Sequence, residues 1–504
     1  MGVLSALYYG FGIALQPWNL LSCFIGVFIG TLVGVLPGIG PAGAMSLLLP
    51  VTFGMSPVTG IIMLAGIYYG TMYGGSTTSI LVNIPGEAAS IVTCLDGYQM
   101  ALKGRAGPAL GIAAFGSFIA GTGCIIGLIF MTNALAGVAL VFGPTEYFSL
   151  MCLGLSLVTY LTQGSIPRGL AMAGVGLFLS QIGQDVVTGQ TRFSFGLRGL
   201  IDGVGLVPVI MGLFGISEVL LNIEMLEEQR SIMKTTFRHL FPTWDDWRKS
   251  AAPIGRGTLI GFFLGILPGG GALISSFVSY AAEKWFSKHP EEFGKGAIEG
   301  VAGPESANNA ASTSGFIPLF SLGIPSNVIM ALLLGALMIH GLKPGPLMIT
   351  ERPDVFWGTV ASMYVGNAML LMLNLPLIGL WVQVLKVPYR TLFPLILLFC
   401  FIGAYSISAN AFDLYVMLVF GAMGYVLRKK NYECAPLVLA FVLGPMMEKN
   451  LRQALILFDG NLSVFIARPL SLAALVISVV LLLTAVIPFV QKRRREVIAE
   501  EGDG

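Results

Sequence analysis

The chain has 504 residues, of which 55% are hydrophobic and only 11% are charged, and its formal net charge at pH 7 is +2. A soluble domain carries about 25% charged residues, so the composition excludes an ordinary soluble protein, and the small net charge gives no indication of nucleic-acid binding. At about 20 residues for each membrane-crossing helix, we predict an all-α polytopic membrane protein with roughly ten to twelve spans.

The first predicted membrane helix is interrupted by the sequence Pro37-Gly38-Ile39-Gly40-Pro41. Proline removes a backbone donor and clashes with the preceding turn, and glycine permits backbone angles that other residues avoid. Apolar residues resume at Met45, so we expect the interruption to lie within the membrane. Irregular backbone at that depth is tolerated only where protein or a water-filled cavity satisfies it. Many secondary transporters build their binding sites from such broken helices.

The second half of the chain contains the same motif. The stretch Gly261-Phe-Phe-Leu-Gly265-Ile-Leu-Pro268-Gly269-Gly-Gly271 repeats the spacing of Gly30-Thr-Leu-Val-Gly34-Val-Leu-Pro37-Gly38-Ile-Gly40. Two long matched copies predict two membrane repeats, each with a broken-helix or re-entrant hairpin at a Leu-Pro-Gly motif. The alternative is that both copies are tight helix-packing sites without a ligand.

Polar motifs follow each copy. Tyr73-Gly-Gly-Ser76-Thr77-Thr78-Ser79 in the first half is answered by Gly303-Pro-Glu305-Ser-Ala-Asn308-Asn309-Ala-Ala-Ser312-Thr313-Ser314-Gly315 in the second. Likewise, Asn83-Ile-Pro85-Gly86-Glu87 is answered by Gly323-Ile-Pro325-Ser326-Asn327. Glycine, hydroxyl and amide residues inside apolar segments are typical of binding sites, although membrane hydroxyls often bond to a carbonyl one turn back.

Basic residues predict the orientation, because cytoplasmic loops are rich in Lys and Arg. With the basic clusters 428–430 and 492–495 inside, the equivalent residues Arg105 and Lys343 fall on opposite faces, as inverted-topology repeats require. The predicted ranges are 1–222 for the first membrane repeat, 223–256 for a cytoplasmic hydrophilic linker, 257–430 for the second repeat, 431–491 for C-terminal spans and 492–504 for a cytoplasmic tail.

These motifs make the chain similar to the TctA family, the large membrane subunits of bacterial tripartite tricarboxylate transporters. The resemblance is carried by both Leu-Pro-Gly stretches, by Tyr73 to Glu87, and by Gly303 to Ala310. It implies a permease in the bacterial inner membrane that imports an organic acid anion such as citrate, or a related dicarboxylate or aromatic acid. It also implies a small membrane subunit of the TctB type, a periplasmic binding protein of the TctC type, and coupling to an ion gradient, Na⁺ or H⁺.

A carboxylate in the membrane needs compensation for its lost hydration. Helix N-termini restarting after the two breaks offer unpaired N–H groups and partial positive charge, and the hydroxyls and amides can donate to an anion or accept a cation. We therefore expect one central site shared by the repeats. Its candidates are Pro37, Gly38, Gly40, Ser76, Thr77, Thr78, Ser79, Asn83, Pro268, Gly269, Gly271, Glu305, Asn308, Asn309, Ser312, Thr313 and Ser314, with hinge or packing positions at Gly30, Gly34, Pro85, Gly86, Gly261, Gly265 and Pro325.

Several alternatives remain open from the sequence. Glu305 is either functional or a cap for a half-helix, and we expect Glu87 and Asp96 at a rim. The chain shows no HExxH, GxSxG or Walker motif, and its six cysteines form no CxxC pair, so we expect neither an enzyme nor a cofactor or structural metal site. The competing functions are a stand-alone carboxylate carrier and a channel, and a channel would normally show a charged filter.

Overall fold

The computed structural model describes residues 2–36, 40–139, 142–161, 165–185, 188–224, 240–269, 271–387 and 389–484. Within them the secondary structure is helical apart from one two-stranded hairpin, as the composition predicts. Contacts divide the chain into two units that are discontinuous in sequence. Unit 1 comprises Met1–Ala136, Val207–Ile266 and Gly270–Tyr425, and unit 2 comprises Gly137–Leu206, Leu267–Gly269 and Val426–Gly504.

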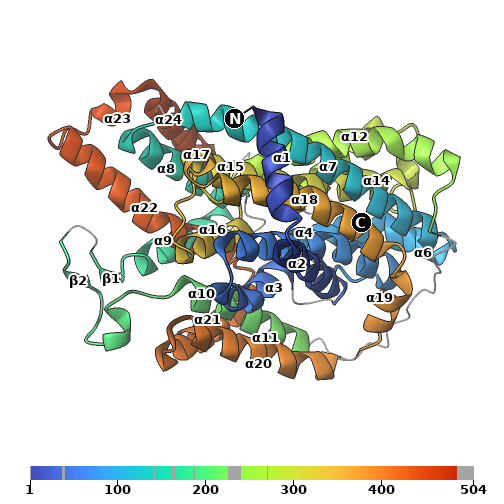
Figure 1. Ribbon diagram of the computed structural model, residues 1–504, viewed down its shortest axis with the longest axis horizontal. Helices are drawn as coiled ribbons and strands as arrows, with labels where there is room; N and C mark the ends of the chain where they lie inside the picture. The colour runs from blue at the N-terminus through green and yellow to red at the C-terminus, as the bar shows by residue number, and fades with distance from the viewer. Residues whose placement is uncertain are drawn as a thin grey trace. The chain divides into compact units, whose positions relative to one another are not determined.

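Unit 1 holds most of the helices (Figure 1). They are α1 (Val3–Ala14), α2 (Pro17–Val35), α3 (Gly40–Leu48), η1 (Leu49–Gly54), α4 (Pro57–Val82), η2 (Ala88–Ser90), α5 (Ile91–Thr93), η3 (Cys94–Tyr98), α6 (Gln99–Leu102), most of α7 (Ala106–Ala139), α10 (Leu206–Ile210), η5 (Met211–Ile216), α11 (Ser217–Glu224), α12 (Trp244–Ile266), α13 (Gly271–Phe286), η7 (Pro290–Glu292), α14 (Glu299–Ser314), α15 (Phe316–Leu322), α16 (Val328–Ile339), α17 (Met348–Glu351), α18 (Pro353–Asn374), α19 (Ile378–Val384), α20 (Tyr389–Ser408) and most of α21 (Ala411–Lys429).

Unit 2 is smaller. It contains α8 (Pro144–Leu161), α9 (Ile166–Leu179), β1 (Gly183–Gln184), β2 (Thr191–Arg192), η4 (Arg198–Leu200), α22 (Ala435–Leu457), α23 (Val464–Ala467) and α24 (Pro469–Thr484).

Five helices among the described residues are long and apolar enough to cross a membrane. They are Pro17–Val35, Ala106–Gly137, Leu206–Glu224, Pro353–Asn374 and Ala411–Lys429. Shorter apolar helices, such as α16 and α24, accompany them. The chain is therefore an all-α membrane protein, while the count of ten to twelve spans stays a prediction.

Two helix pairs in unit 1 pack in the same unusual way, backbone against backbone. An added Cβ on Gly26, Gly30 or Gly34 of α2 would overlap a carbonyl oxygen of α4, at Met63, Ile67 and Thr71 respectively. On α12, Gly257, Gly261 and Gly265 meet the carbonyl oxygens of Gly303, Ala307 and Ala311 of α14. Small residues allow this close approach. The two Gly-x-x-x-Gly stretches are thus packing surfaces that hold α4 and α14, the helices that carry the polar motifs.

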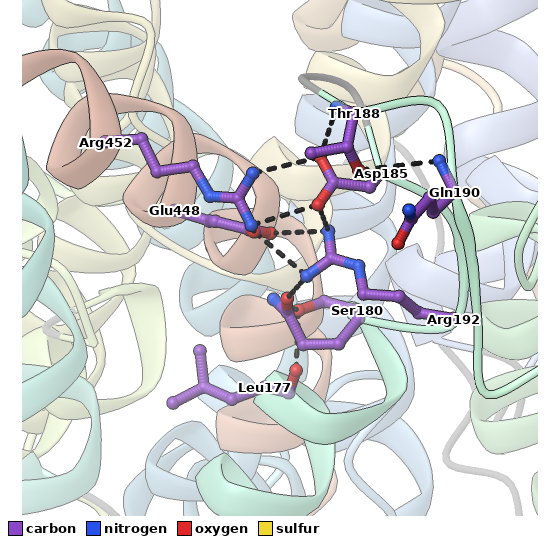
Figure 2. Close-up of polar contacts among 9 residues, drawn as sticks. Leu177, Ser180, Asp185, Thr188, Gln190, Arg192, Glu448 and Arg452 are labelled. Carbon is purple, nitrogen blue, oxygen red and sulfur yellow. Dashed lines mark hydrogen bonds and ion pairs between the residues drawn. The ribbon is translucent and has the colours of Figure 1, made fainter. Parts of the chain in front are cut away.

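Unit 2 contains a short hairpin held by ion pairs (Figure 2). Strands β1 and β2 pair antiparallel, with Gly183 opposite Arg192. Arg452 of α22 donates to both carboxylate oxygens of Asp185 at 3.0 Å, and Arg192 donates to Glu448 at 2.9 Å. Two acids and two arginines neutralise one another here, so these ion pairs serve to hold the hairpin against α22.

Part of the predicted hydrophilic linker is helical. Residues 244–256 form the first half of α12, and Trp247 packs against Phe115 of α7 with ring centroids 5.4 Å apart. Residues 225–239 lie outside the described residues. The beginning predicted for the second repeat, residue 257, therefore falls within a continuous helix.

Candidate functional site

Helices α4 and α14 are polar and yet buried. Every residue from Gly60 to Val82 of α4 is buried, as is every residue from Gly300 to Ser314 of α14. Burying hydroxyl, amide and carboxyl groups costs free energy unless they are paired. Because α14 packs against α4, the polar motifs of the two halves meet inside unit 1.

Two carboxylates and one amide form the centre of this contact. Ser76 donates to Glu305 at 2.5 Å, and Thr93 of α5 donates to its other oxygen. Asn308 donates from Nδ2 to Glu87 at 3.1 Å, and the backbone N–H of Ala89 donates to Glu87 at 2.5 Å. We refer to Ser76, Glu87, Thr93, Glu305 and Asn308 as the acidic cluster.

Burial corrects two of the expectations from the sequence. Glu87 and Asp96, which we expected at a rim, are 6% and 0% exposed. Glu87 caps the short helix η2 and packs against Gly75 of α4, where an added Cβ would lie 2.8 Å from its Cγ. Asp96 accepts from the backbone N–H groups of Gly296 and Ala297 at 2.7 and 2.8 Å. Both acids are close in sequence to a hydrophilic loop, which is why we expected them to be exposed. In the structure Glu87 is covered by α4 at Gly75, and Asp96 is covered by the segment at Gly296 and Ala297.

A second polar contact extends the acidic cluster toward α7. Asn309 donates from Nδ2 to Ser117 at 2.7 Å and to the backbone oxygen of Glu305 at 3.2 Å. Ser117 is 1% exposed and lies in the otherwise apolar α7. The amide oxygens Oδ1 of Asn308 and Asn309 are buried and have no hydrogen-bond partner among the described residues.

Most of the other candidate hydroxyls donate to backbone carbonyls. Ser79 donates to Gly75 at 3.0 Å, one turn back. Ser312 and Thr313 donate to Asn309 at 2.9 and 3.0 Å. Such local bonds are common for hydroxyls in membrane helices. To donate to a carboxylate, these three side chains would first have to give up their backbone partners.

Two hydroxyls join helices instead. Thr78 donates to the carbonyl of Val35, the last residue of α2, at 2.6 Å. Ser314 donates to the carbonyl of Gly261 on α12 at 3.3 Å. Each satisfies or shares a backbone oxygen of the glycine-bearing helix, so both hydroxyls tie a helix pair together.

The two five-residue loop motifs adopt matching backbone conformations. Asn83 and Gly323 both end a helix in the left-handed region, with φ of 60° and 71°, where asparagine and glycine are favoured. Four residues later, Glu87 and Asn327 each cap the next helix, accepting from Ala89 and Met330. Asn83 is exposed; its position is that of a helix cap rather than a member of the acidic cluster.

The same loops make matching cross-contacts. Glu87 accepts from Asn308 of α14, and Asn327 donates to Tyr68 of α4 at 3.3 Å. An added Cβ on Gly86 would overlap the carbonyl oxygen of Gly34, so Gly86 fits closely between α2 and α4. The local structure thus repeats between the halves, and Pro85 and Pro325 occupy equivalent places in it. Their relation by inversion across a membrane stays a prediction.

The helix breaks are only partly described. Helix α12 ends at Ile266 and α13 begins at Gly271, whose φ is 47°. Gly269, with φ of 82°, packs against Val158 of α8, and it and Pro268 belong to unit 2. In the first half α3 begins at Gly40 in the left-handed region, whereas Pro37 and Gly38 lie outside the described residues. A shared anion site built from the two breaks therefore stays a prediction.

A pocket lies beside the acidic cluster. Asn374 on α18 donates from Nδ2 to Leu370 at 2.9 Å, and its Oδ1 has no partner among the described residues. Tyr73 donates to Asn367 at 2.6 Å. None of the lining residues is basic, so hydroxyl and amide groups supply its polarity. The lining residues are Tyr73, Ser76, Thr77, Leu110, Ala113, Ala114, Ser117, Asn374 and Leu375.

Sequence reasoning missed four polar members of this region, Glu87, Thr93, Ser117 and Asn374. Thr93 lies in a short helix, and Ser117 and Asn374 are single polar residues in apolar helices α7 and α18. Ser117 and Asn374 could have been found from the sequence because each is a single polar residue in an apolar stretch. A lone polar residue in a membrane helix most often faces the protein interior.

Comparisons with known proteins give a consistent picture. Residues 20–439 match the model of the "Tripartite tricarboxylate transporter TctA family". The chain is 50% identical over 501 residues, covering 99% of it and all of the relative, to an Agrobacterium vitis protein named "Uncharacterized 52.8 kDa protein in TAR-I ttuC' 3'region". A second Agrobacterium vitis protein, "Uncharacterized protein in TAR-II ttuC' 3'region", is 52% identical over 241 residues, which is 48% of this chain and all of the relative. No solved structure matches the chain.

Proposed function

This chain belongs to the tripartite tricarboxylate transporter TctA family, and from that premise we propose that it is the membrane permease of a secondary active importer for an organic acid anion. The substrate is a tricarboxylate such as citrate or a related dicarboxylate or aromatic acid. Uptake is driven by an ion gradient, with Na⁺ as the coupling ion. A small TctB-type membrane subunit and a periplasmic TctC-type binding protein complete the system.

The observation that carries this proposal is the pocket beside the acidic cluster. A permease needs polar groups within apolar helices, and Tyr73, Ser76, Thr77, Ser117 and Asn374 line a pocket of about 10 Å³, which holds roughly one water molecule and has to widen to admit a carboxylate. Hydroxyl and amide N–H groups can donate to carboxylate oxygens. The absence of Lys or Arg from the lining means that a second ion must offset the negative charge of the substrate, which is the physical reason for coupling.

Contacts within unit 2 support the proposed orientation. Arg168, at the start of α9, donates to the carbonyls of Lys430 and Asn431, before α22 begins. Beyond the end of α9, Arg192 on β2 pairs with Glu448, which lies in the second half of α22. The two helices therefore run in parallel, and the positive-inside rule, applied to the basic residues Arg428 to Lys430, supports a cytoplasmic position for their beginnings. The β1–β2 hairpin then faces the periplasm of a bacterial inner membrane.

Uptake into proteoliposomes tests the proposal. The permease and its small subunit are reconstituted, and the binding protein is added outside with a labelled carboxylate that it has been shown to bind. We expect saturable uptake that requires an inward Na⁺ gradient and the binding protein. Uptake that persists without the binding protein would favour a stand-alone carrier, and uptake that does not saturate would favour a channel.

A pair of isosteric variants on one helix tests the pocket. Thr77→Val removes a hydroxyl from the pocket lining, and we expect the apparent KM to rise about 10-fold, the usual result of losing one hydrogen bond to a charged group. Thr71→Val is the matched control, because that hydroxyl donates to Ile67 at 2.7 Å within α4. Equal kinetics in the two variants would remove Thr77 from the site.

A further inference from the structure

The two carboxylates of the acidic cluster are buried without a basic partner. Glu305 is 0% and Glu87 is 6% exposed. Their hydrogen-bond donors are Ser76 and Thr93 for Glu305, and Asn308 and the N–H of Ala89 for Glu87. No contact found among the described residues brings a Lys, Arg or His side chain to either one. Two neighbouring buried carboxylates cannot both stay ionised unless a positive charge joins them.

The geometry places these oxygens together across two helices. Glu305 and Asn308 lie one turn apart on α14, so their side chains share a face. Opposite them on α4, Ser76 reaches Glu305, and its neighbour Gly75 packs against Glu87. The oxygen atoms of both halves of the chain therefore converge on one small volume.

This volume also contains an acceptor that lacks a donor. The amide of Asn308 is directed at Glu87 through Nδ2, which leaves its Oδ1 buried and unpartnered within the described structure. Oδ1 of Asn309 is also buried without a partner among the described residues, but that side chain is directed at Ser117 of α7 and is not a member of the cluster. A buried acceptor without a partner costs about 1–3 kcal/mol. A proton would satisfy one pair of oxygens, whereas a cation coordinates several oxygens at once.

We propose that the acidic cluster is a sodium site, with ligands drawn from Glu305, Ser76, Asn308 and Glu87. The inference rests on the proposed function and assigns its coupling ion to named residues. Hard cations prefer carboxylate, carbonyl and hydroxyl oxygens, which is the donor set here.

The position of the pocket next to the acidic cluster predicts an order in which sodium and the substrate bind. Ser76 belongs to both the acidic cluster and the pocket lining, and Ser117 of the lining contacts the backbone of Glu305. A substrate carboxylate in the pocket would lie beside Ser76, whose hydroxyl is bonded to Glu305, so the two negative charges would be close together. Sodium therefore binds first, and the anion binds only to the loaded site.

The matching cross-contact in the other half lacks this chemistry. There Tyr68 and Asn327 replace the Asn308–Glu87 pair, and both are neutral. Among the described residues the Asn327–Tyr68 contact has no carboxylate, so the sodium site is assigned to the contact between Glu87 and Asn308.

Sodium binding to the purified permease without substrate tests the assignment. The unfolding midpoint is followed as NaCl replaces choline chloride at constant ionic strength, and uptake of radioactive sodium by the protein is measured directly. We expect a saturable rise in the midpoint for the wild type. Glu305→Gln and Ser76→Ala should each weaken sodium affinity by at least about 10-fold, and Glu299→Gln, at the start of the same helix, should leave it unchanged.

Two outcomes would overturn the assignment. One is wild-type sodium affinity in a folded Glu305→Gln protein, as judged by size-exclusion chromatography. Another is a midpoint that rises with falling pH but not with NaCl, which would make the coupling ion a proton. Either result leaves carboxylate uptake intact as a separate measurement, so failure of the sodium site is distinguishable from failure of the proposed function.

Discussion

Among the described residues, some buried carboxylates have an arginine partner and others have none, and the comparison of Asp185 with Glu305 shows what this difference implies. In unit 2, Asp185 is 6% exposed and is paired with Arg452 and Arg192. In unit 1, Glu305 is 0% exposed and is bonded to two hydroxyls. A paired acid is already neutralised, so removing it leaves its partner uncompensated. An acid that meets only hydroxyls has no fixed positive partner, which is the property that the proposed sodium site requires.

The largest expected effect is on the paired acid. Asp185→Asn should lower the free energy of unfolding by about 2 kcal/mol, less than for a fully buried pair because the arginines are about a third exposed. Thermal unfolding in detergent measures it, with the exposed Asp202→Asn as the control in the same unit. Uptake per folded molecule should be unchanged. If the Asp185→Asn variant were as stable as the wild type, Asp185 would not be a structural acid, and its comparison with Glu305 would lose its basis.

A smaller loss is expected at a second paired acid. The side chain of Glu283 on α13 is 1% exposed and accepts two hydrogen bonds from Arg256 of α12. Glu283→Gln keeps the shape but removes the charge, so stability should fall by about 1–2 kcal/mol. The same unfolding assay applies. If sodium affinity also fell, Glu283 would belong with the acidic cluster, and the division between paired and unpaired acids would need revision.

For Glu305, which has no arginine partner, we expect the corresponding substitution to raise the free energy of unfolding instead of lowering it. Without sodium, Glu305 must either stay charged beside Glu87 or take up a proton, and both cost free energy. Glu305→Gln removes this cost, while an amide can still bond to Ser76 and Thr93. The free energy of unfolding should therefore rise by about 1 kcal/mol in sodium-free buffer. Comparison of midpoints in choline chloride and in NaCl gives the measurement. Destabilisation in sodium-free buffer would show that Glu305 is held by partners other than those seen here.

The smallest effect on stability is expected for a solvent-exposed ion pair. Asp245 and Lys249 are four residues apart on α12, with side chains 68% and 52% exposed. Asp245→Asn should change stability by less than about 0.5 kcal/mol. A larger change would mean that ion pairing alone, rather than burial, sets the order of these effects.

The sequence predicted some parts of this arrangement well. The all-helical membrane character follows from composition, and the end of α12 at Ile266 follows from Pro268 and its glycines. Ser76, Glu305 and Asn308 stood out because they are polar residues within apolar surroundings. These signals are local, so a single stretch of chain is enough to read them.

The remaining parts depend on packing between distant segments. Nothing near Glu87 indicates that Asn308 will reach it, and the proximity of Thr93 and Ser117 to Glu305 arises only when α5 and α7 meet α14. The hydroxyls of Ser79, Ser312 and Thr313 looked equivalent to that of Ser76 in sequence. Their backbone bonds are decided by which side of each helix faces the neighbouring helix.

The glycine contacts of α2 with α4, and of α12 with α14, restrict how the protein can move. In each pair the backbones are in direct contact, so no flexible side chains lie between the helices. One helix cannot slide along the other without a steric clash, and we expect each pair to move as a rigid unit. A motion that separates the two pairs would therefore have to change the contact between α4 and α14, and an ion bound at that contact would hold the two pairs together.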